Sequence, residues 1–394
     1  MKWASTLRSG ANAGELVGRG ADEVEERLEG ARVDLVFAFM TPHYAREFSH
    51  LARLLKDRFP RAVVAGCTAG GVIGGGREEE DHPSVSLMAG NLPGVELHPV
   101  YTDTEDLPDE DAAPEVWRSW LGMGNHGQAG HAILLADPFT ATIEPFVAGF
   151  DYAYPAGVRL GGLASGGRRP GDHGLFFQDQ VFRQGLVAVG LSGEVEVDAV
   201  VAQGCRPLGE PLVVTHSRQN TLFEVNHESP LIYLNRVFQK ASEGDRDLMR
   251  NSLFLGIQVG EDAPFLIRNV MAANYQQGTL NVGAYLHEGQ VVQFHVRDRG
   301  SAAEELNQHL GAYAREAPVL EGAGALLFSC LGRGRHLFGE AGHDTGCFRR
   351  QVGGLPVGGF FCNGEIGPVG GSTYIHGYTS AFGVIRPALR KGVQ

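Results

Sequence analysis

The chain of 394 residues is long enough for two or three domains, and its 43% hydrophobic content supplies a sizeable core, which excludes a disordered chain. Its formal net charge is −13, with 33 basic and 46 acidic residues and no basic cluster, so neither nucleic acid nor an anionic membrane surface is an expected partner. The sequence has no apolar run of transmembrane length and no secretory signal, and its five widely spaced cysteines predict free thiols, so we expect a cytoplasmic protein.

Glycine is unusually frequent, and its positions mark a repeated unit. The chain has 56 glycines, about twice the usual share, without the three-residue period of collagen. Three times, a strand-length apolar run is followed by a helical segment and then by a strand that enters a glycine cluster. The three cycles begin at VDLVFAFM (33–40), HAILLADPF (131–139) and ALLFSCLGRGR (325–335), and reach glycine at Gly66, Gly161–Gly162 and Gly358–Gly359.

Each cycle has the length of a βαβ unit, in which two parallel strands are joined by a helix. We therefore expect the first run of each cycle to be a strand in a helix-covered sheet, including Phe37, Leu134 and Phe328. The glycine loops are expected to follow the carboxyl ends of the strands. A side chain would collide there with a neighbouring backbone, which explains the choice of glycine at Gly66, Gly161 and Gly358.

A β-rich stretch separates the second cycle from the third. It contains amphipathic helical patterns at 229–242 and 301–317, and the chain closes with STYIHGYTSAFGVI as a strand. Helices interleaved with hairpin-like strands predict an α/β to α+β fold of layered mixed β-sheets covered by helices. No linker-like composition divides the chain, so we expect two tightly packed halves with a boundary near 215–230.

Several familiar catalytic patterns are missing from the sequence. The glycine loop at 66–76 is not followed by the helix that a dinucleotide fingerprint requires, and no P-loop pattern is present. Ser165 lacks both the spacing and the following helix of a nucleophile elbow. The histidines and cysteines show no metal-ligand spacing, so no metal site is expected.

Polar side chains are densest near the C-terminal strands. Cys330 ends an apolar strand, and Arg333 three residues later would lower the pKa of a neighbouring thiol; the alternative is that Cys330 is a small buried hydrophobe. Glu365 either accepts backbone N–H groups in a turn or faces a polar ligand. His376 and Tyr378 are two residues apart on an expected strand and so point to the same face. This pairing is equally compatible with His376 being a core histidine whose hydrogen bonds are satisfied.

Seven strings spread from about Val33 to Ile385 carry a family resemblance: AVVAGCTAGGVIG, RLGGLASGG, FLIRNVM, VQFHVRD, LLFSCLGRGRHLFG, PVGGFFCNGEIGPVGG and HGYTSAFGVI. In this order they resemble the FIST family, in which a FIST N-terminal region precedes a FIST C-terminal region. The resemblance implies an N-terminal lead-in over 1–30, a FIST N-terminal domain over 31–225 and a FIST C-terminal domain over 226–390.

The resemblance also implies a function in sensing. FIST regions are regarded as sensory domains that bind small ligands, amino acids among them, and that act on kinase, chemoreceptor or cyclic-dinucleotide output modules. Some bacterial members are similar to haem-based nitric oxide sensors. Because the FIST regions occupy the whole sequence, we expect the readout to lie in a separate partner protein.

Three functions remain open at this point, beside a purely scaffolding role. The first is a stand-alone ligand-binding protein without a cofactor, whose pocket lies at the C-terminal strand ends, with Arg268 and Arg333 clamping a carboxylate. The second is a haem protein with a histidine or Cys330 as non-covalent axial ligand. The third is an enzyme with Cys330 as nucleophile and His336 or His376 as base.

The predicted ligand site brings together residues that are far apart in the sequence. Its members are Arg268, Cys330, Arg333, Gly334, Asn363, Glu365, His376 and Tyr378. If the strands 325–330, 357–362 and 374–384 are neighbours, their polar ends meet at one rim. A buried arginine is costly unless paired, so we expect Arg333 to bond Glu365, backbone carbonyls or a ligand anion.

Overall fold

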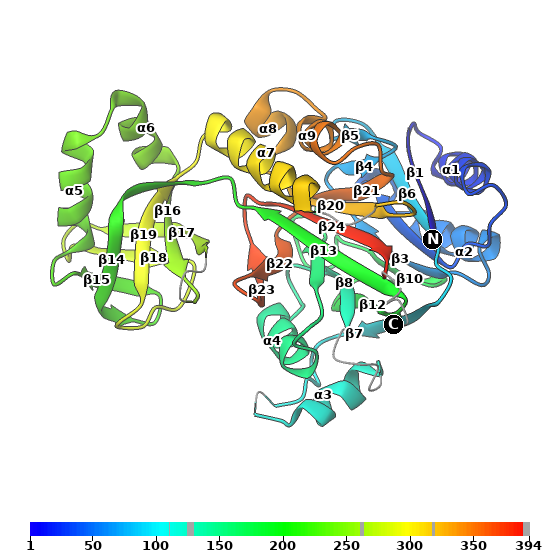
Figure 1. Ribbon diagram of the computed structural model, residues 1–394, viewed down its shortest axis with the longest axis horizontal. Helices are drawn as coiled ribbons and strands as arrows, with labels where there is room; N and C mark the ends of the chain where they lie inside the picture. The colour runs from blue at the N-terminus through cyan, green and yellow to red at the C-terminus, as the bar shows by residue number, and fades with distance from the viewer. Residues whose placement is uncertain (110, 124–129, 261–263, 317–319, 389–394) are drawn as a thin grey trace, which may run out of the picture. The chain divides into compact units, whose positions relative to one another are not determined.

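The computed structural model describes residues 1–109, 111–123, 130–260, 264–316 and 320–388 (Figure 1). The chain divides into two compact units. The first comprises Met1–Val201, Asn307–Pro368 and Ser372–Gln394, and the second comprises Ala202–Leu306 with Val369–Gly371. The units therefore do not coincide with the two sequence regions, because the first unit includes residues that follow Leu306, the end of the main segment of the second unit.

The first unit contains three copies of one strand pattern, which confirms the predicted repeat. In copy one the elements are β2 (Leu35–Met40), α2 (Phe48–Arg58), β3 (Val63–Thr68), the hairpin β4 (Val72–Gly74) and β5 (Arg77–Glu79), β6 (Ser84–Asn91) and β7 (Val95–Thr102). In copy two they are β8 (His131–Ala136), α4 (Ile143–Ala153), β9 (Arg159–Leu163), the hairpin β10 (Leu175–Phe177) and β11 (Gln180–Phe182), β12 (Leu186–Gly193) and β13 (Val195–Ala202).

Copy three is divided between the two ends of the chain. Its elements are β20 (Gly324–Cys330), α8 (Gly334–Phe338), α9 (His343–Gln351), β21 (Val357–Cys362), the hairpin β22 (Glu365–Val369) and β23 (Ser372–His376), and β24 (Ser380–Pro387). The place of its last strand is taken by β1 (Lys2–Ser9). The other described helices of the first unit are α1 (Ala13–Arg27), the 3₁₀ turn η1 (Pro42–Tyr44), α3 (Pro114–Leu121) and the later part of α7 (Arg299–Glu316), which begins in the second unit.

The three copies exchange strands to form three six-stranded sheets. Their strand orders are β1-β6-β2-β3-β10-β11, β7-β12-β8-β9-β22-β23 and β13-β24-β20-β21-β4-β5. Each sheet keeps the parallel pair of one copy, takes its hairpin from the next copy and takes its far edge strand from the preceding one. Because every sheet needs strands from three copies, no copy can complete its hydrogen bonding alone.

Glycine allows the two parallel strands of each copy to pair closely. A Cβ at Gly66 would lie 1.9 Å from the Ala38 oxygen, and a Cβ at Gly161 would lie 1.9 Å from the Leu134 oxygen. In copy three the equivalent residue is Gly359, whose Cβ would lie 1.9 Å from a backbone oxygen, whereas Gly358 faces a methionine side chain. The expected collision is confirmed, but the glycines lie within the strands and the third position is shifted by one residue.

The core of the first unit follows from the alternation of residues along these strands. One buried cluster is formed by side chains that point inward from the three sheets, among them Phe37, Ile133, Leu135 and Phe328. The opposite faces carry separate clusters, one under α1 and α2 and one under α3 and α4. The predicted helix-covered sheets are therefore confirmed.

The described residues of the second unit form a closed barrel, two helices and the first part of α7. Its strands, in barrel order, are β14 (Arg206–Arg218), β15 (Thr221–Val225), β18 (Thr279–Val282), β17 (Phe265–Asn274), β16 (Leu253–Gln258) and β19 (Val291–Val296). The helices are α5 (Pro230–Lys240) and α6 (Glu243–Asn251), both green in Figure 1. Ser229 caps α5, since its Oγ accepts the Leu231 N–H at 3.2 Å and Pro230 begins the helix.

Two stretches differ from the sequence predictions. Residues 1–30, assigned to a lead-in, supply an edge strand and a helix, with β1 antiparallel to β6. The expected final strand is broken into β23 and β24 at Gly377–Thr379, where Tyr378 adopts a φ of +64°. A left-handed residue cannot continue a strand, so His376 and Tyr378 do not share a strand face. No helix among the described residues has the length and apolarity needed to cross a membrane.

Candidate functional site

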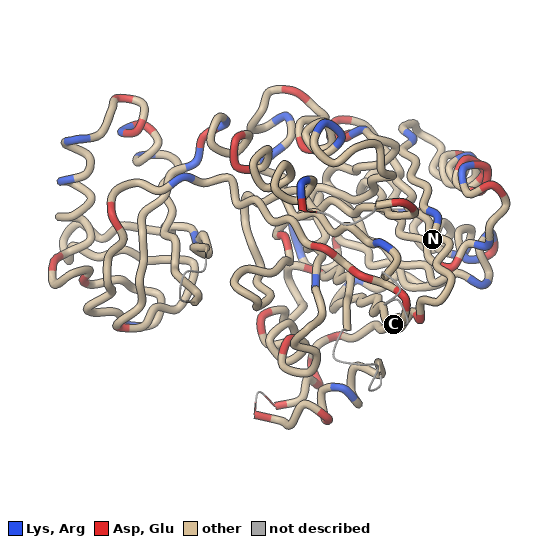
Figure 2. The backbone as a smooth tube through the Cα atoms, viewed as in Figure 1, with Lys and Arg blue, Asp and Glu red and all other residues tan. Residues whose placement is uncertain are grey.

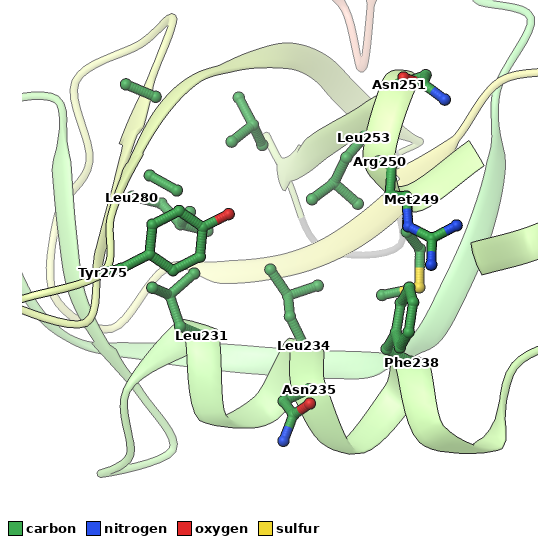
Figure 3. Close-up of a pocket in the computed structure, with 13 residues that line it drawn as sticks. Leu231, Leu234, Asn235, Phe238, Met249, Arg250, Asn251, Leu253, Tyr275 and Leu280 are labelled. Carbon is green, nitrogen blue, oxygen red and sulfur yellow. The ribbon is translucent and has the colours of Figure 1, made fainter. Parts of the chain in front are cut away.

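A groove of about 640 Å³ lies in the second unit between α5, α6 and the barrel (Figure 3). Leu231, Leu234 and Phe238 face it from α5, because residues three and four positions apart share one side of a helix. Leu253 and Leu280 face it from the barrel strands. A volume of this size is in the range of small-molecule sites, which are typically apolar with a few polar groups.

The apolar lining of the groove is incompletely covered. Leu280 and Leu234 are buried at 1% and 8% exposure, while Leu231, Met249 and Leu253 are half-buried. The helix α6, which supplies Met249, has no fully buried residue. Apolar surface left partly exposed in a concavity stabilises whatever covers it, by about 25 cal/mol for each Å² removed from water.

The arginine among the described lining residues lies at one end of the groove together with Asn251, whereas Asn235 and the Tyr275 hydroxyl lie elsewhere along it. Figure 3 shows Arg250, Asn251 and Phe238 on one side, and Tyr275 with Leu231 and Leu280 on the other. The Arg250 guanidinium lies 5.0 Å from the centre of the Phe238 ring, and its Nη1 donates to Asp247 at 2.7 Å.

The sequence-predicted site lies in the first unit, where the strands 324–330, 357–362 and 380–387 are neighbours in one sheet, as expected. Cys330 and Cys362 are paired in register at the ends of β20 and β21. The Cys330 N–H donates to the Thr379 oxygen at 3.0 Å, and the Thr379 N–H donates to Glu365 Oε2 at 3.0 Å. These contacts bring Cys330, Cys362 and Glu365 into one neighbourhood.

The thiol of Cys362 is shielded by this neighbourhood. Burial, and then the nearby Glu365, Cys67 and Cys330, raise the pKa of Cys362 well above its usual value. A Cβ at Gly162 would lie 2.2 Å from the Cys362 Sγ, so glycine makes room for the thiol. A buried thiol with a raised pKa is inert rather than nucleophilic.

Arg333 lies in a different environment from the one predicted. Its Nε and Nη2 donate to the two carboxylate oxygens of Asp344 at 2.8 and 2.9 Å, and both side chains are buried. Burial alone would raise the pKa of Asp344, but Arg333 and His343 lower it below its usual range. The expected bridge to Glu365 is thus replaced by an ion pair with α9, which follows Arg333 by one helical turn and a loop.

The hairpin β4–β5 adds two carboxylates beside this ion pair. Glu78 accepts the Gly342 and Thr345 N–H groups at 3.0 and 2.8 Å, at the amino end of α9. Burial and repulsion from Asp344 raise the pKa of Glu78 to about 7. Glu80 accepts the Arg335 N–H at 3.0 Å and lies where a Cβ of Gly334 would be, so Gly334 is needed for this contact.

The other predicted site residues are dispersed. His376 is buried and its Nε2 lies 3.0 Å from the Gly367 oxygen, while Asn363 is exposed. Tyr378 lies against Gly332, next to the Cys330 thiol. Arg268 is on β17 in the second unit, so it does not belong to the same unit as the rest.

Sequence reasoning missed both the partner of Arg333 and the groove. Asp344 and Glu78 carry no motif and are 266 positions apart, so only the strand exchange reveals them. The signal for the groove was the amphipathic pattern at 229–242, which predicts a helix but does not indicate whether its apolar face is covered.

The fold defines an α/β protein of three interlocked repeats with a barrel unit, and the groove in that unit has the volume of a small-molecule pocket. Family models match over most of the chain, the FIST N domain at residues 34–228 and the FIST C domain at 231–368. The chain belongs to the FIST family, whose domains are sensory and bind small ligands. The groove helix α5 begins at the start of the FIST C match.

Related proteins extend over nearly the same length. An uncharacterized protein of Mycobacterium tuberculosis (strain ATCC 25618 / H37Rv) is 31% identical over 92% of this chain and 93% of its own length. An uncharacterized protein of Mycobacterium bovis is 33% identical over 92% of each chain. Among solved structures, a cyanuic acid hydrolase from A. caulinodans aligns with 98% of this chain and 100% of its own chain, at 10% sequence identity and a TM-score of 0.37. At this score the likeness bears on neither fold nor function.

Proposed function

We propose that this protein is a stand-alone sensory protein that binds a small molecule, such as an amino acid or a carboxylate, in the groove of its barrel unit. The observation that carries the proposal is the groove itself: it has a volume of about 640 Å³, half-buried apolar side chains in its lining, and Arg250 with Asn251 at one end. Its position in the FIST C region agrees with the small-ligand binding of the family.

A separate partner protein would carry the signal onward. The same unit exposes several large apolar side chains, with Met271 67%, Tyr285 72% and Tyr275 86% exposed. Exposed aromatic side chains are typical of protein-binding surfaces, and Tyr275 also lines the groove. A ligand that contacts Tyr275 would therefore alter the surface presented to a partner.

The proposal is tested by filling the groove. Ala273 lines it and is exposed, so Ala273→Trp should occupy the site without disturbing the core. Amino acids and small carboxylates are screened for stabilisation of the wild-type protein, since a ligand raises the melting temperature by mass action. Stabilising compounds should lose their effect on Ala273→Trp and keep it on Val213→Trp, an exposed barrel position outside the groove. Equal stabilisation of both variants would refute the groove as the site.

The strand ends of the first unit remain a second candidate site. The support for it is the convergence of Cys330, Glu365 and Tyr378 around Gly332 and Thr379. Ligands of this site would respond to Glu365→Gln and ignore Ala273→Trp.

Haem binding and thiol catalysis remain further alternatives. Of the described residues that line the groove, Met249 offers a sulfur ligand, and none is histidine or cysteine. An absorption spectrum of the purified protein tests haem, and alkylation rates at Cys330 as a function of pH test a reactive thiol.

A further inference from the structure

We propose that the ligand of the barrel groove is an elongated amphiphilic monoanion, a carboxylate with a medium-length apolar chain, whose head lies at Arg250 and whose chain runs along α5 towards Tyr275. This inference rests on the groove being the ligand site. It adds the chemical class and the orientation of the ligand, which follow from the charge, polarity and shape of the lining.

The charge of the groove differs from that of the rest of the chain. The chain carries 46 acidic and 33 basic residues, yet the 13 described residues that line the groove include Arg250 and no Asp or Glu. Figure 2 shows acidic as well as basic residues on α6, so the difference in charge is confined to the lining itself. Among these lining residues the carboxylate of a monoanion meets the guanidinium of Arg250, whose partner Asp247 is 66% exposed and lies outside the lining.

Arg250 is held in position and can exchange its partner. Its guanidinium lies over Phe238, and Arg246 lies 5.5 Å from the same ring and donates to the carbonyl oxygens of Phe238 and Gln239 at the end of α5. The side chains of Arg250 and Asp247 are 58% and 66% exposed, so their ion pair contributes little. A ligand carboxylate can therefore replace Asp247 at small cost.

The apolar lining predicts the shape of the chain. Leu231 and Phe238 are seven residues apart on α5, so the groove extends for about 10 Å along the helix. Figure 3 shows Leu234 and Leu253 between the Arg250 end and the Tyr275 end, with Asn235 beside Leu234 on α5. A straight hydrocarbon chain would cover these half-buried side chains, whereas a compact polar ligand would leave them exposed to water.

The test is calorimetric titration of the full-length protein with decanoate, decanol and leucine below any micelle concentration. Decanoate should bind at least 10-fold more tightly than either of the others. Arg250→Gln should weaken decanoate binding by roughly 10-fold to 100-fold, the scale of a hydrogen bond to a charged group, and leave decanol binding unchanged. The matched control is Arg218→Gln, an exposed barrel arginine outside the groove, which should change neither.

Three results would overturn the inference: no binding of decanoate, equal binding of decanoate and decanol, or undiminished decanoate binding by Arg250→Gln. Retained decanol binding shows that the variant is folded. If leucine or another compound binds the wild type and not Ala273→Trp while decanoate fails, the ligand class is wrong and the groove remains the site. If no compound is sensitive to Ala273→Trp, the proposed function itself fails.

Discussion

Replacing Asp344 with asparagine should lower the free energy of unfolding of the first unit by about 3–5 kcal/mol. The side chains of Arg333 and Asp344 are 0% and 2% exposed and are joined by two hydrogen bonds of 2.8 and 2.9 Å. Asparagine preserves the shape and one acceptor but removes the charge. The Arg333 guanidinium is then buried beside a neutral amide, which is far more costly than the loss of an exposed ion pair.

The assay is denaturant unfolding followed by tryptophan fluorescence. All three tryptophans of the chain, Trp3, Trp117 and Trp120, lie in the first unit, so their emission reports that unit alone. The midpoint should shift while the slope of the transition stays the same.

A double variant separates the cost of an unpaired charge from the cost of lost packing. Arg333→Met with Asp344→Leu removes both charges, and should recover most of the stability, with an interaction free energy of at least about 2 kcal/mol. A loss below about 1 kcal/mol for Asp344→Asn would refute the buried pair. If Arg333→Met instead weakened carboxylate binding without lowering stability, Arg333 would be the ligand clamp that the sequence predicted.

Three further predictions concern the first unit. Gly161→Ala should lower the free energy of unfolding by more than about 4 kcal/mol, because the new Cβ would lie 1.9 Å from the Leu134 oxygen. The control is Gly18→Ala on α1, whose Cβ would have nothing within 4 Å and which should be neutral or stabilising in the same denaturation assay. Burial and repulsion from Arg159 lower the pKa of His131 to about 4. Its neutral form therefore stabilises the fold above pH 6.5, and this contribution is lost as the pH falls towards 4. His131→Asn keeps an acceptor for the Val158 N–H and should remove that loss when melting temperatures are measured over a series of pH values. The pKa of Glu78 is raised to about 7, so its contribution to the stability of the fold is complete below about pH 4.5 and is lost as the pH rises to 7. Glu78→Gln should abolish this decline in stability, and an unchanged pH profile of the variant would refute the prediction.

The repeat and the class of fold were predictable from residue order. Apolar runs of strand length, a helical period between them and glycine at the second strand are local properties, and they placed Phe37, Leu134 and Phe328 correctly on strands. The collision at Gly66 and Gly161 was also predictable, because closely paired parallel strands leave no space for a side chain. In copy three the sequence has two adjacent glycines, and only the register shows that Gly359 is the equivalent residue.

The pairing of charged groups and the openness of the groove were decided by the tertiary structure. Strand exchange carries Glu78 from copy one to the helix that supplies Asp344, and no sequence pattern indicates which copy a hairpin joins. The apolar face of α5 was readable from its period, but the period of a helix does not record whether a neighbouring element covers that face. In this protein α6 covers it only in part, because none of its side chains is fully buried, and the groove is the consequence.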